Sequence, residues 1–137
     1  MERTFAIIKP DAVAARYTAR IIQRIEESGF TIRAIRLVHL SQKDAEGFYA
    51  VHKERPFFAS LTKFMSSGPC VVMALEAADA IKKWRTLMGA TDPAKADANT
   101  LRKEFGASIE NNATHGSGAP ETAAFELGYF FRGMELR

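Results

Sequence analysis

The sequence predicts a single domain of the α+β class, in which helices pack against one β-sheet. The chain has 137 residues, of which 47% are hydrophobic and 26% charged, and this profile is typical of one globular domain. Short apolar stretches that predict strands alternate with stretches of helical periodicity. Repeats, low-complexity segments and domain boundaries are not visible, so residues 1–137 are predicted to fold as one unit.

Two strands and three helices are expected in the first half of the chain. Thr4–Ile8 is an almost continuous apolar stretch, typical of a strand buried on both faces, and Pro10 ends it because proline cannot extend a β-ladder. The isoleucines of residues 18–28 fall on one helical stripe. Ser41 and Asp44 have the spacing of a capping box and predict a helix start. The expected elements are a strand at 4–8, a helix at 18–28, a strand at 30–40, and helices beginning at Ser41 and Pro56.

The second half is expected to add two strands and three helices. Cys70–Leu75 is another continuous apolar stretch, and the helical pattern of residues 78–88 stops at Gly89. Residues 90–100 have almost no apolar periodicity, which indicates a long loop. The expected elements are a strand at 70–75, a helix at 78–88, a short helix carrying Arg102, a strand at 113–115, and a helix from Pro120.

This order of elements contains two β-α-β halves that share one sheet. The fold prediction is therefore a ferredoxin-like α+β sandwich, with a four-stranded antiparallel sheet and helices on one side of it.

Charge and cysteine content exclude several classes of protein. Lys and Arg total 19 against 16 Asp and Glu, and the basic residues form no block, so no extended nucleic-acid surface is expected. A few arginines converging on a small phosphate ligand would fit the same balance. The single cysteine, Cys70, cannot build a disulfide framework or a zinc site, which favours a reducing compartment. No membrane span or secretory signal is visible, so a cytoplasmic location is predicted.

His115 is the strongest candidate for a reactive residue. Gly116 and Gly118 follow it and allow backbone freedom or a close approach to a ligand, while Asn112 and Ser117 place short hydrogen-bonding side chains on either flank. The alternative is a turn histidine that bonds its own loop. Phosphate-binding P-loops, protein-kinase catalytic loops, metal-ligand clusters and serine-hydrolase signatures are absent from the sequence.

Several other residues have both a structural and a functional interpretation. Lys9 ends a buried strand and is either a functional cation or a surface lysine. Arg85 lies in the last turn of a predicted helix, where the helix dipole alone explains it. Tyr49 and His52 lie either at the edge of the core or in the lining of a site, and edge packing is the better interpretation of His52. The aromatic residues around Phe57 either form core or offer a ring to a ligand base.

The segment Asn112-Ala113-Thr114-His115-Gly116-Ser117 resembles the active-site signature of nucleoside diphosphate kinases. Other blocks of the chain look like further motifs of that family and occur in the same order. The resemblance covers essentially the whole chain, at the length of the short bacterial members. These blocks are Ile8-Lys9-Pro10-Asp11, Tyr49 with His52-Lys53-Glu54-Arg55-Pro56-Phe57-Phe58, Ser67-Gly68-Pro69, and Met88-Gly89-Ala90-Thr91-Asp92-Pro93.

The resemblance implies a ping-pong reaction that maintains nucleoside and deoxynucleoside triphosphate pools. A nucleoside triphosphate, typically ATP, would give its γ-phosphoryl group to His115, and a nucleoside diphosphate would take it back. Glu126 would orient the imidazole, and Ser117 would be a neighbouring hydrogen bond. Mg²⁺ would bridge the phosphates and be held mainly by the nucleotide and water rather than by the protein.

The resemblance also implies a set of nucleotide contacts. Lys9, Arg55, Arg85, Thr91 and Arg102 match phosphate-contacting positions, and arginine suits this role because its planar fork makes paired charged hydrogen bonds. Lys9 and Asn112 match contacts to the ribose 3′-hydroxyl, with Tyr49 supporting Lys9; Phe57 matches the ring that stacks on the base, with Leu61 and Ile109 as apolar neighbours.

Three departures from the family pattern bear on these expectations. Arg16-Tyr17-Thr18 replaces a stretch that usually carries Gly or Asn and contributes to subunit contacts. Asn99 replaces a glycine, so the long loop could take a different path. Gly118 stands at a position where aspartate is common. The resemblance implies a homo-oligomer, either a tetramer or a hexamer.

Two alternative functions are weighed against this one. The first is a catalytically weak or inactive nucleotide-binding regulatory module of the same fold, against which the presence of every catalytic position argues. The second is a nucleic-acid-binding α+β domain, which the lack of aromatic-basic alternation in the strands disfavours.

Overall fold

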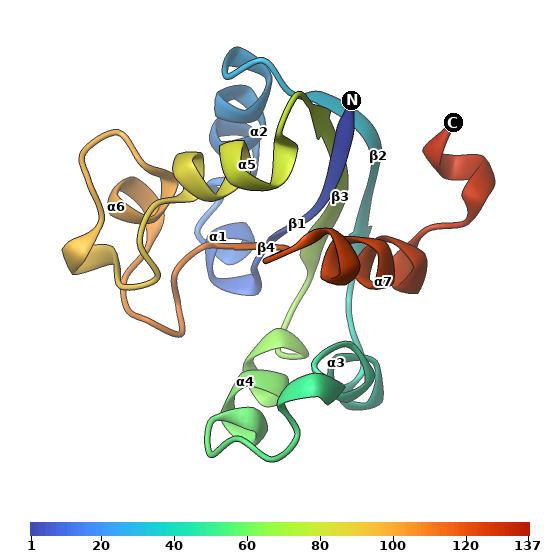
Figure 1. Ribbon diagram of the computed structural model, residues 1–137. Helices are drawn as coiled ribbons and strands as arrows, with labels where there is room; N and C mark the ends of the chain where they lie inside the picture. Colours follow the sequence, from blue (N-terminus) through green and yellow to red (C-terminus); the bar gives the residue numbers. More distant parts are fainter.

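The computed structural model describes residues 1–137 as a four-stranded antiparallel sheet flanked by helices (Figure 1). The strand order is β2-β3-β1-β4, and every neighbouring pair is antiparallel. The predicted ferredoxin-like α+β fold is therefore confirmed. The strands are β1 (Glu2–Ile8), β2 (Thr31–Val38), β3 (Cys70–Ala77) and β4 (Thr114–Gly116).

The helices follow the predicted order with two differences. A short helix, α1, directly follows β1, because Pro10 at its first position and Asp11 in its first turn start a helix as well as ending the strand. Helix α4 begins at Phe58 rather than Pro56, since Phe57 occupies the N-cap position. The helices are α1 (Pro10–Ala14), α2 (Thr18–Glu27), α3 (Gln42–Phe48), α4 (Phe58–Met65), α5 (Ala80–Met88), α6 (Leu101–Phe105) and α7 (Pro120–Phe130), with 3₁₀ turns η1 (Ala50–His52), η2 (Pro93–Lys95) and η3 (Gly133–Leu136).

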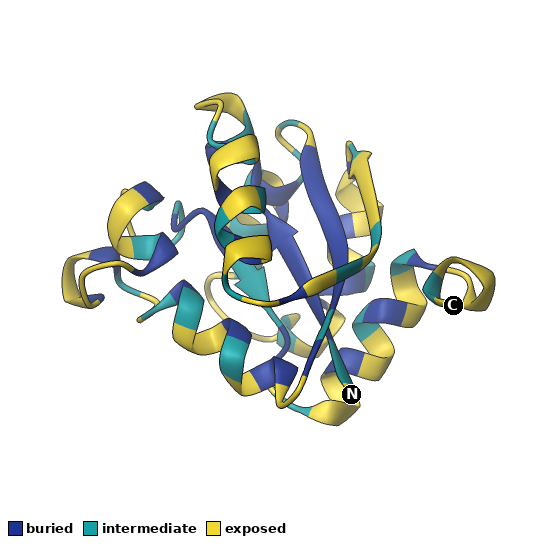
Figure 2. Cartoon of the chain, turned by 90° about the horizontal axis from the view of Figure 1, so that it is seen from above, coloured by how far each residue is buried: buried dark blue, intermediate teal, exposed yellow.

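Helices cover both faces of the sheet, so the prediction of helices on one side is wrong. Ala6 and Ile8 of β1 face a core built with α1, α2, α5 and α6. Phe5 and Ile7 face the opposite core, built with α3, α4 and α7. The physical reason is the continuous apolar character of β1 and β3, which are buried along nearly their whole length (Figure 2), because a strand that is apolar on both faces needs cover on both.

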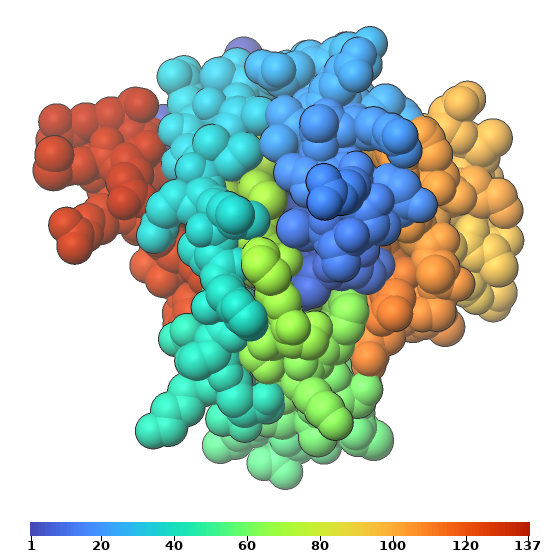
Figure 3. Space-filling view, turned by 180° about the vertical axis from the view of Figure 1, so that it is seen from behind, coloured from blue at the N-terminus to red at the C-terminus, as the bar shows by residue number.

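Strand β2 forms one edge of the sheet and is much less buried than β1 and β3. Ile35 and Leu37 are 46% and 67% exposed on it. The C-terminal turn η3 lies beside this strand, where Arg36 and Glu135 approach to 3.6 Å (Figure 3). No helix of the chain has both the length and the apolar character that a membrane crossing requires.

Two of the sequence departures lie at left-handed backbone positions. Asn99 has φ 68°, a region that glycine favours and asparagine tolerates, so asparagine in place of glycine needs no different path for the loop. The expectation of an altered loop is not supported at this residue. Arg16 has φ 66° between α1 and α2, where its side chain is exposed.

The pairing of β1 with β4 brings the first strand of the chain beside the strand that carries His115. Ile7 lies opposite His115, and Ile8 lies opposite Thr114. The backbone N–H of Lys9 then donates to the carbonyl of Ala113 (2.8 Å). Because of this register, Lys9 and His115 emerge from neighbouring strands.

Candidate active site

His115 is held by a carboxylate at one ring nitrogen. Its Nε2 lies 3.2 Å from Oε1 of Glu126 on α7, and the Ser117 hydroxyl donates to the same oxygen (2.7 Å). Ser117 is buried and also accepts from the backbone N–H of Phe5 (3.3 Å). The three residues predicted to form the reactive centre are therefore in direct contact.

This contact determines which ring nitrogen is free. An ionised carboxylate only accepts hydrogen bonds, so Nε2 of a neutral His115 carries the proton and Nδ1 keeps its lone pair. The aromatic rings of Phe48 and Tyr49 lie edge-on to the imidazole, with centroids at 5.5 and 5.9 Å. The side chain is only 19% exposed, so the ring is fixed by packing as well as by Glu126.

His115 lies in the lining of a cleft of about 400 Å³ that combines cationic and apolar side chains. The cleft gathers residues from the end of β1, the segment from the end of α3 through η1 to α4, α6, the loop after α5, and β4 with the loop before it. Most of the residues that the sequence predicts for nucleotide binding meet here. The lining consists of Lys9, Tyr49, His52, Phe57, Leu61, Thr91, Arg102, Ile109, Glu110, Asn112 and His115.

Lys9 and Asn112 form the polar floor of the cleft. The Lys9 ammonium donates to Oδ1 of Asn112 (2.8 Å), whose Nδ2 donates to the carbonyl of Thr91 (3.0 Å). Burial, together with the nearby charge of Arg102, lowers the pKa of Lys9 to about 8. Lys9 has no carboxylate in direct contact, so its charge is available to an anion.

Arg102 is anchored to the backbone on two sides. Its Nη1 donates to the carbonyl of Gly89 and its Nη2 to that of Thr114, both at 3.0 Å, while its buried Nε has no partner. Burial, and to a smaller extent the charge of Arg85, lowers the pKa of Arg102 to about 10. The cleft therefore contains two desolvated cations with unused capacity for an anionic ligand.

Four of the predicted residues lie outside the cleft lining. Glu126 contacts His115 from outside the cleft, and Ser117 hydrogen-bonds to Glu126, as described above. Arg85 is exposed and lines a neighbouring hollow, where its Nη1 lies 3.5 Å from the carbonyl of Gly118. Arg55 is exposed in the segment between η1 and α4 and contributes no side-chain hydrogen bond. The structure thus does not bring Arg55 and Arg85 to the cleft wall.

Tyr49 differs from the expectation that it supports Lys9. Its hydroxyl is buried and has no hydrogen-bond partner, although both side chains line the same cleft. Burial raises the pKa of Tyr49 far above its usual range, and the charge of Glu126 adds to this shift. Tyr49 therefore acts on the site as a neutral ring packed against His115.

Two cleft residues are missing from the sequence prediction. His52 faces the cleft and lies between the rings of Tyr49 (6.5 Å between centroids) and Phe57 (5.6 Å), so its interpretation as edge packing is incomplete. Its position within the His-Lys-Glu-Arg-Pro-Phe-Phe block is the signal that could have identified it. Glu110 accepts from the Ser60 hydroxyl (2.6 Å) and so connects the loop before β4 to α4; no sequence pattern marks it.

Gly116 serves packing, and neither of the roles predicted for it is seen. Its φ lies outside the left-handed region. A Cβ at this position would overlap the indole of Trp84 and lie 2.6 Å from Cε of Met88, so the close approach is to the core and not to a ligand. Trp84 is fully buried and donates from Nε1 to the carbonyl of His115 (3.1 Å). Glycine at position 116 therefore allows β4, the strand that carries His115, to pack closely against α5.

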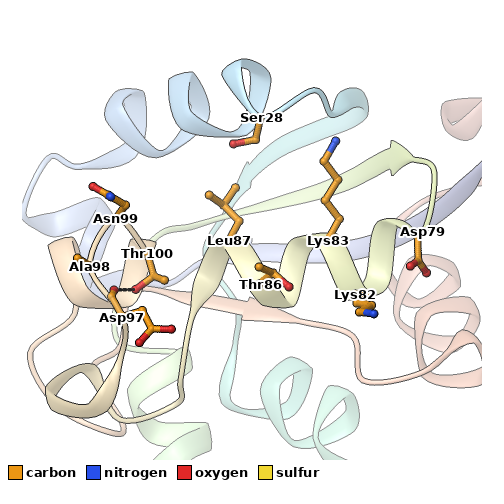
Figure 4. A pocket seen from close by; sticks show the side chains of 10 residues that line it. All are labelled: Ser28, Asp79, Lys82, Lys83, Thr86, Leu87, Asp97, Ala98, Asn99 and Thr100. Carbon is orange, nitrogen blue, oxygen red and sulfur yellow. Dashed lines mark hydrogen bonds between the residues drawn. The ribbon is translucent and has the colours of Figure 1, made fainter.

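Other hollows on the surface contain no predicted site residue or only Arg85. The hollow drawn in Figure 4, of about 600 Å³, is lined mainly by α5 and by residues 97–100, with Lys82, Lys83, Asp79 and Asp97 among its side chains. It holds no histidine and no buried unpaired cation. No three His, Cys, Asp or Glu side chains lie close enough together to bind a metal ion.

The contact of Gly116 with Trp84 leads to a stability prediction. Gly116→Ala should lower the free energy of unfolding by about 1–3 kcal/mol, because the added methyl overpacks the core. Gly118→Ala is the matched control, since a Cβ there meets only Nη1 of Arg85 at an ordinary 3.6 Å and should change stability by less than about 0.5 kcal/mol. Urea denaturation of both variants measures the difference, and equal losses would contradict this account of Gly116.

Comparisons with known proteins agree with this geometry. The family model of nucleoside diphosphate kinases matches residues 2–136. The nucleoside diphosphate kinases of Desulfotalea psychrophila and Syntrophotalea carbinolica are 62% and 63% identical over 136 residues, covering 99% of each chain. The crystal structure of the Aquifex aeolicus enzyme superposes with a TM-score of 0.97 at 42% identity, over 99% of both chains. The Halobacterium salinarum enzyme, solved in complex with CDP, gives 0.94 at 36%, over 99% of this chain and 91% of that one. The chain belongs to the nucleoside diphosphate kinase family.

Proposed function

We propose that this chain transfers the γ-phosphoryl group of a nucleoside triphosphate to a nucleoside diphosphate, with Nδ1 of His115 as the intermediate carrier. The observation that carries the proposal is the contact between Nε2 of His115 and Glu126, which leaves Nδ1 as the free nucleophile in a cleft with two desolvated cations. Family membership supplies the reaction class, and the CDP complex of the Halobacterium salinarum relative supports a nucleoside diphosphate as ligand.

The transfer occurs in two matched steps. The Nδ1 lone pair attacks the γ-phosphorus in line, a P–N bond forms, and the bond to the bridging oxygen breaks so that its electrons leave on the nucleoside diphosphate. The ring then carries a positive charge, which the Glu126 carboxylate at Nε2 stabilises. A β-phosphate oxygen of the second nucleotide attacks the same phosphorus, and the electrons of the P–N bond return to Nδ1. Ser117 holds Glu126 in place through both steps.

The remaining cleft residues suit the parts of a nucleotide. Lys9 and Arg102 would contact the phosphates, with Thr91 beside them, and Lys9 with Asn112 would contact the ribose 3′-hydroxyl. Phe57 and Ile109 are 47% and 61% exposed in the cleft, and such apolar surface without core contacts suits stacking on a base of any kind. Leu61 would extend this apolar wall. Arg55 and Arg85 would reach the phosphates only by moving toward the cleft.

Magnesium enters this proposal as part of the substrate. The cleft wall presents cations, an amide and a single carboxylate, that of Glu110, and no cluster of carboxylates could supply the oxygen ligands that this ion prefers. The phosphates and water would therefore supply its ligands, and the ion would neutralise phosphate charge.

The single cysteine, Cys70, is buried without a partner, and we propose a cytoplasmic location on this basis.

An inactive nucleotide-binding module is the second candidate function. It would require the loss of at least one contact among His115, Glu126 and Ser117, and all of them are present. We therefore favour the enzyme.

We further propose that copies of this chain assemble into a tetramer or a hexamer. The edge strand β2 exposes Ile35 and Leu37 beside unpaired backbone groups, a combination that favours pairing with another chain. Light scattering should give a mass of four or six times 15.2 kDa. A monomer mass at working concentration would contradict the proposal, and Leu37→Lys should shift the mass downward if β2 forms the contact.

The phosphohistidine step is tested by intact mass. Brief mixing with ATP and magnesium should add one phosphoryl group, and GDP should remove it. His115→Ala should remain unmodified, and His39→Ala is the matched control, because His39 lies outside the cleft and contacts only the Ser66 carbonyl. If the wild-type chain binds nucleotide without gaining mass, the enzyme proposal fails and the binding module replaces it.

The lowered pKa of Lys9 leads to a prediction for basic pH. Because burial disfavours its charged form, Lys9 is protonated below about pH 8 and loses its charge above that value, so kcat/KM should fall as the pH rises through about 8. Bound phosphates favour the charged form of Lys9, so the decrease of kcat, which reports the nucleotide-bound enzyme, should occur at higher pH than the decrease of kcat/KM. Lys9→Arg should move the kcat/KM limb upward, because guanidinium stays charged. A wild-type profile that is flat from pH 7 to 10 would exclude Lys9 as the titrating group.

A further inference from the structure

Ala113 has an unusual backbone for its residue type. It lies between Asn112 and the start of β4 with φ 74°, in the left-handed region, and is fully buried. A Cβ in this region crowds the backbone, so non-glycine residues take it only when their surroundings impose it. The surroundings of Ala113 must therefore hold it there.

Both peptide groups of Ala113 are held by the segment that follows β1. Oδ2 of Asp11 accepts from the Ala113 N–H (3.1 Å), and the Lys9 N–H donates to the Ala113 carbonyl (2.8 Å). The other oxygen of Asp11 is buried without a partner. Burial raises the pKa of Asp11, while the Ala113 N–H lowers it, so this hydrogen bond is one of the contacts that favour the buried carboxylate.

The conformation of Ala113 determines where its neighbours point. Immediately before it, the Asn112 side chain reaches the Lys9 ammonium and the Thr91 carbonyl. Immediately after it, Thr114 enters β4 opposite Ile8, and His115 follows in register. A change of φ at this residue would rotate Asn112 relative to His115, because the two flank it on the same short segment.

Asp11 does not itself line the cleft. It lines a separate hollow, of about 430 Å³, with Val13, Phe64 and Pro69. A direct contact of its carboxylate with the substrate is therefore not part of the arrangement.

We propose that Asp11 is a positioning residue, whose carboxylate holds Ala113 in the left-handed conformation and thereby sets Asn112 and His115 in their mutual orientation. The inference rests on the proposed function for its readout, since that readout is the rate at which ATP phosphorylates His115. This role makes a specific prediction. If Asp11 holds Ala113 in a strained conformation, a glycine at position 113 takes that conformation without strain, and the loss of Asp11 should then have a smaller effect on the phosphorylation rate.

The test is a double-mutant cycle of Asp11→Ala and Ala113→Gly, read by rapid-quench phosphorylation of the full chain. Asp11→Ala alone should slow phosphorylation by about tenfold or more, as expected for a lost charged hydrogen bond to a buried N–H. Ala113→Gly alone should stay within about threefold of wild type, because only the strained conformation is relieved. In the Ala113→Gly background, Asp11→Ala should cost about threefold or less. Asp11→Asn keeps an acceptor oxygen and should retain more activity than Asp11→Ala.

Controls separate positioning from folding and from the enzyme proposal. Asp97→Ala removes an exposed carboxylate that makes no side-chain hydrogen bond, and should leave the rate unchanged. Equal losses from Asp11→Ala in both backgrounds, or no loss in either, would overturn the inference. If Asp11→Ala does not fold, the double variant decides: a folded, active double variant supports the inference, and an unfolded one overturns it. A wild-type chain that is never phosphorylated refutes the proposed function instead, and the amide resonance of residue 113 then reports whether Asp11→Ala still changes its conformation.

Discussion

The geometry of the cleft depends on the pairing of β1 with β4. A seven-residue strand and a three-residue strand meet in a register that sets Ile7 opposite His115, and the chain leaves this pair with Lys9 on one side and Ala113 on the other. So short a strand cannot hold itself in place. Trp84, Phe5 and Arg102 hydrogen-bond to it or to Ser117 beside it, and Gly116 allows the Trp84 contact.

The positive charges in the cleft lower the stability of the folded protein in the absence of ligand. Lys9 and Arg102 are both desolvated, both have lowered pKa values, and neither forms an ion pair. Desolvated cations of this kind destabilise the empty protein and become favourable when an anion arrives. The free energy that is not used for internal ion pairs is thus available for binding an anionic ligand, and it is largest where water is excluded. Glu126, the one carboxylate in contact with His115, lies outside the cleft lining and would not repel such a ligand from within it.

The sequence predicts most elements of the fold, because strands and helices leave periodic apolar patterns. The continuous apolar character of β1 and β3 already indicates cover on both faces of the sheet, but the sequence does not predict which helices cover which face, since that depends on long-range packing of residues such as Phe48 and Leu127. At the site, the family signature identifies His115 and Ser117 and the wider resemblance identifies Glu126, but neither identifies the left-handed backbone of Ala113, for which alanine gives no signal. The helical spacing of His52 favours packing at the edge of the core, but this spacing describes core and cleft residues equally, and the side chain lines the cleft. Arg55 and Arg85 match the family pattern, yet their side chains remain exposed outside the cleft.

The departure at Gly118 bears on Arg85. A Cβ at this position would lie 3.6 Å from Nη1 of Arg85, so an aspartate there would place its carboxylate within reach of the guanidinium. With glycine, Arg85 has only a long contact of 3.5 Å to a backbone carbonyl. A neutral partner holds a guanidinium less firmly than a carboxylate does, and the exposed side chain has many rotamers. Without that carboxylate, less would hold Arg85 at the surface if a bound phosphate were to attract it toward Arg102, and the charge of Arg85 already contributes to the lowered pKa of Arg102.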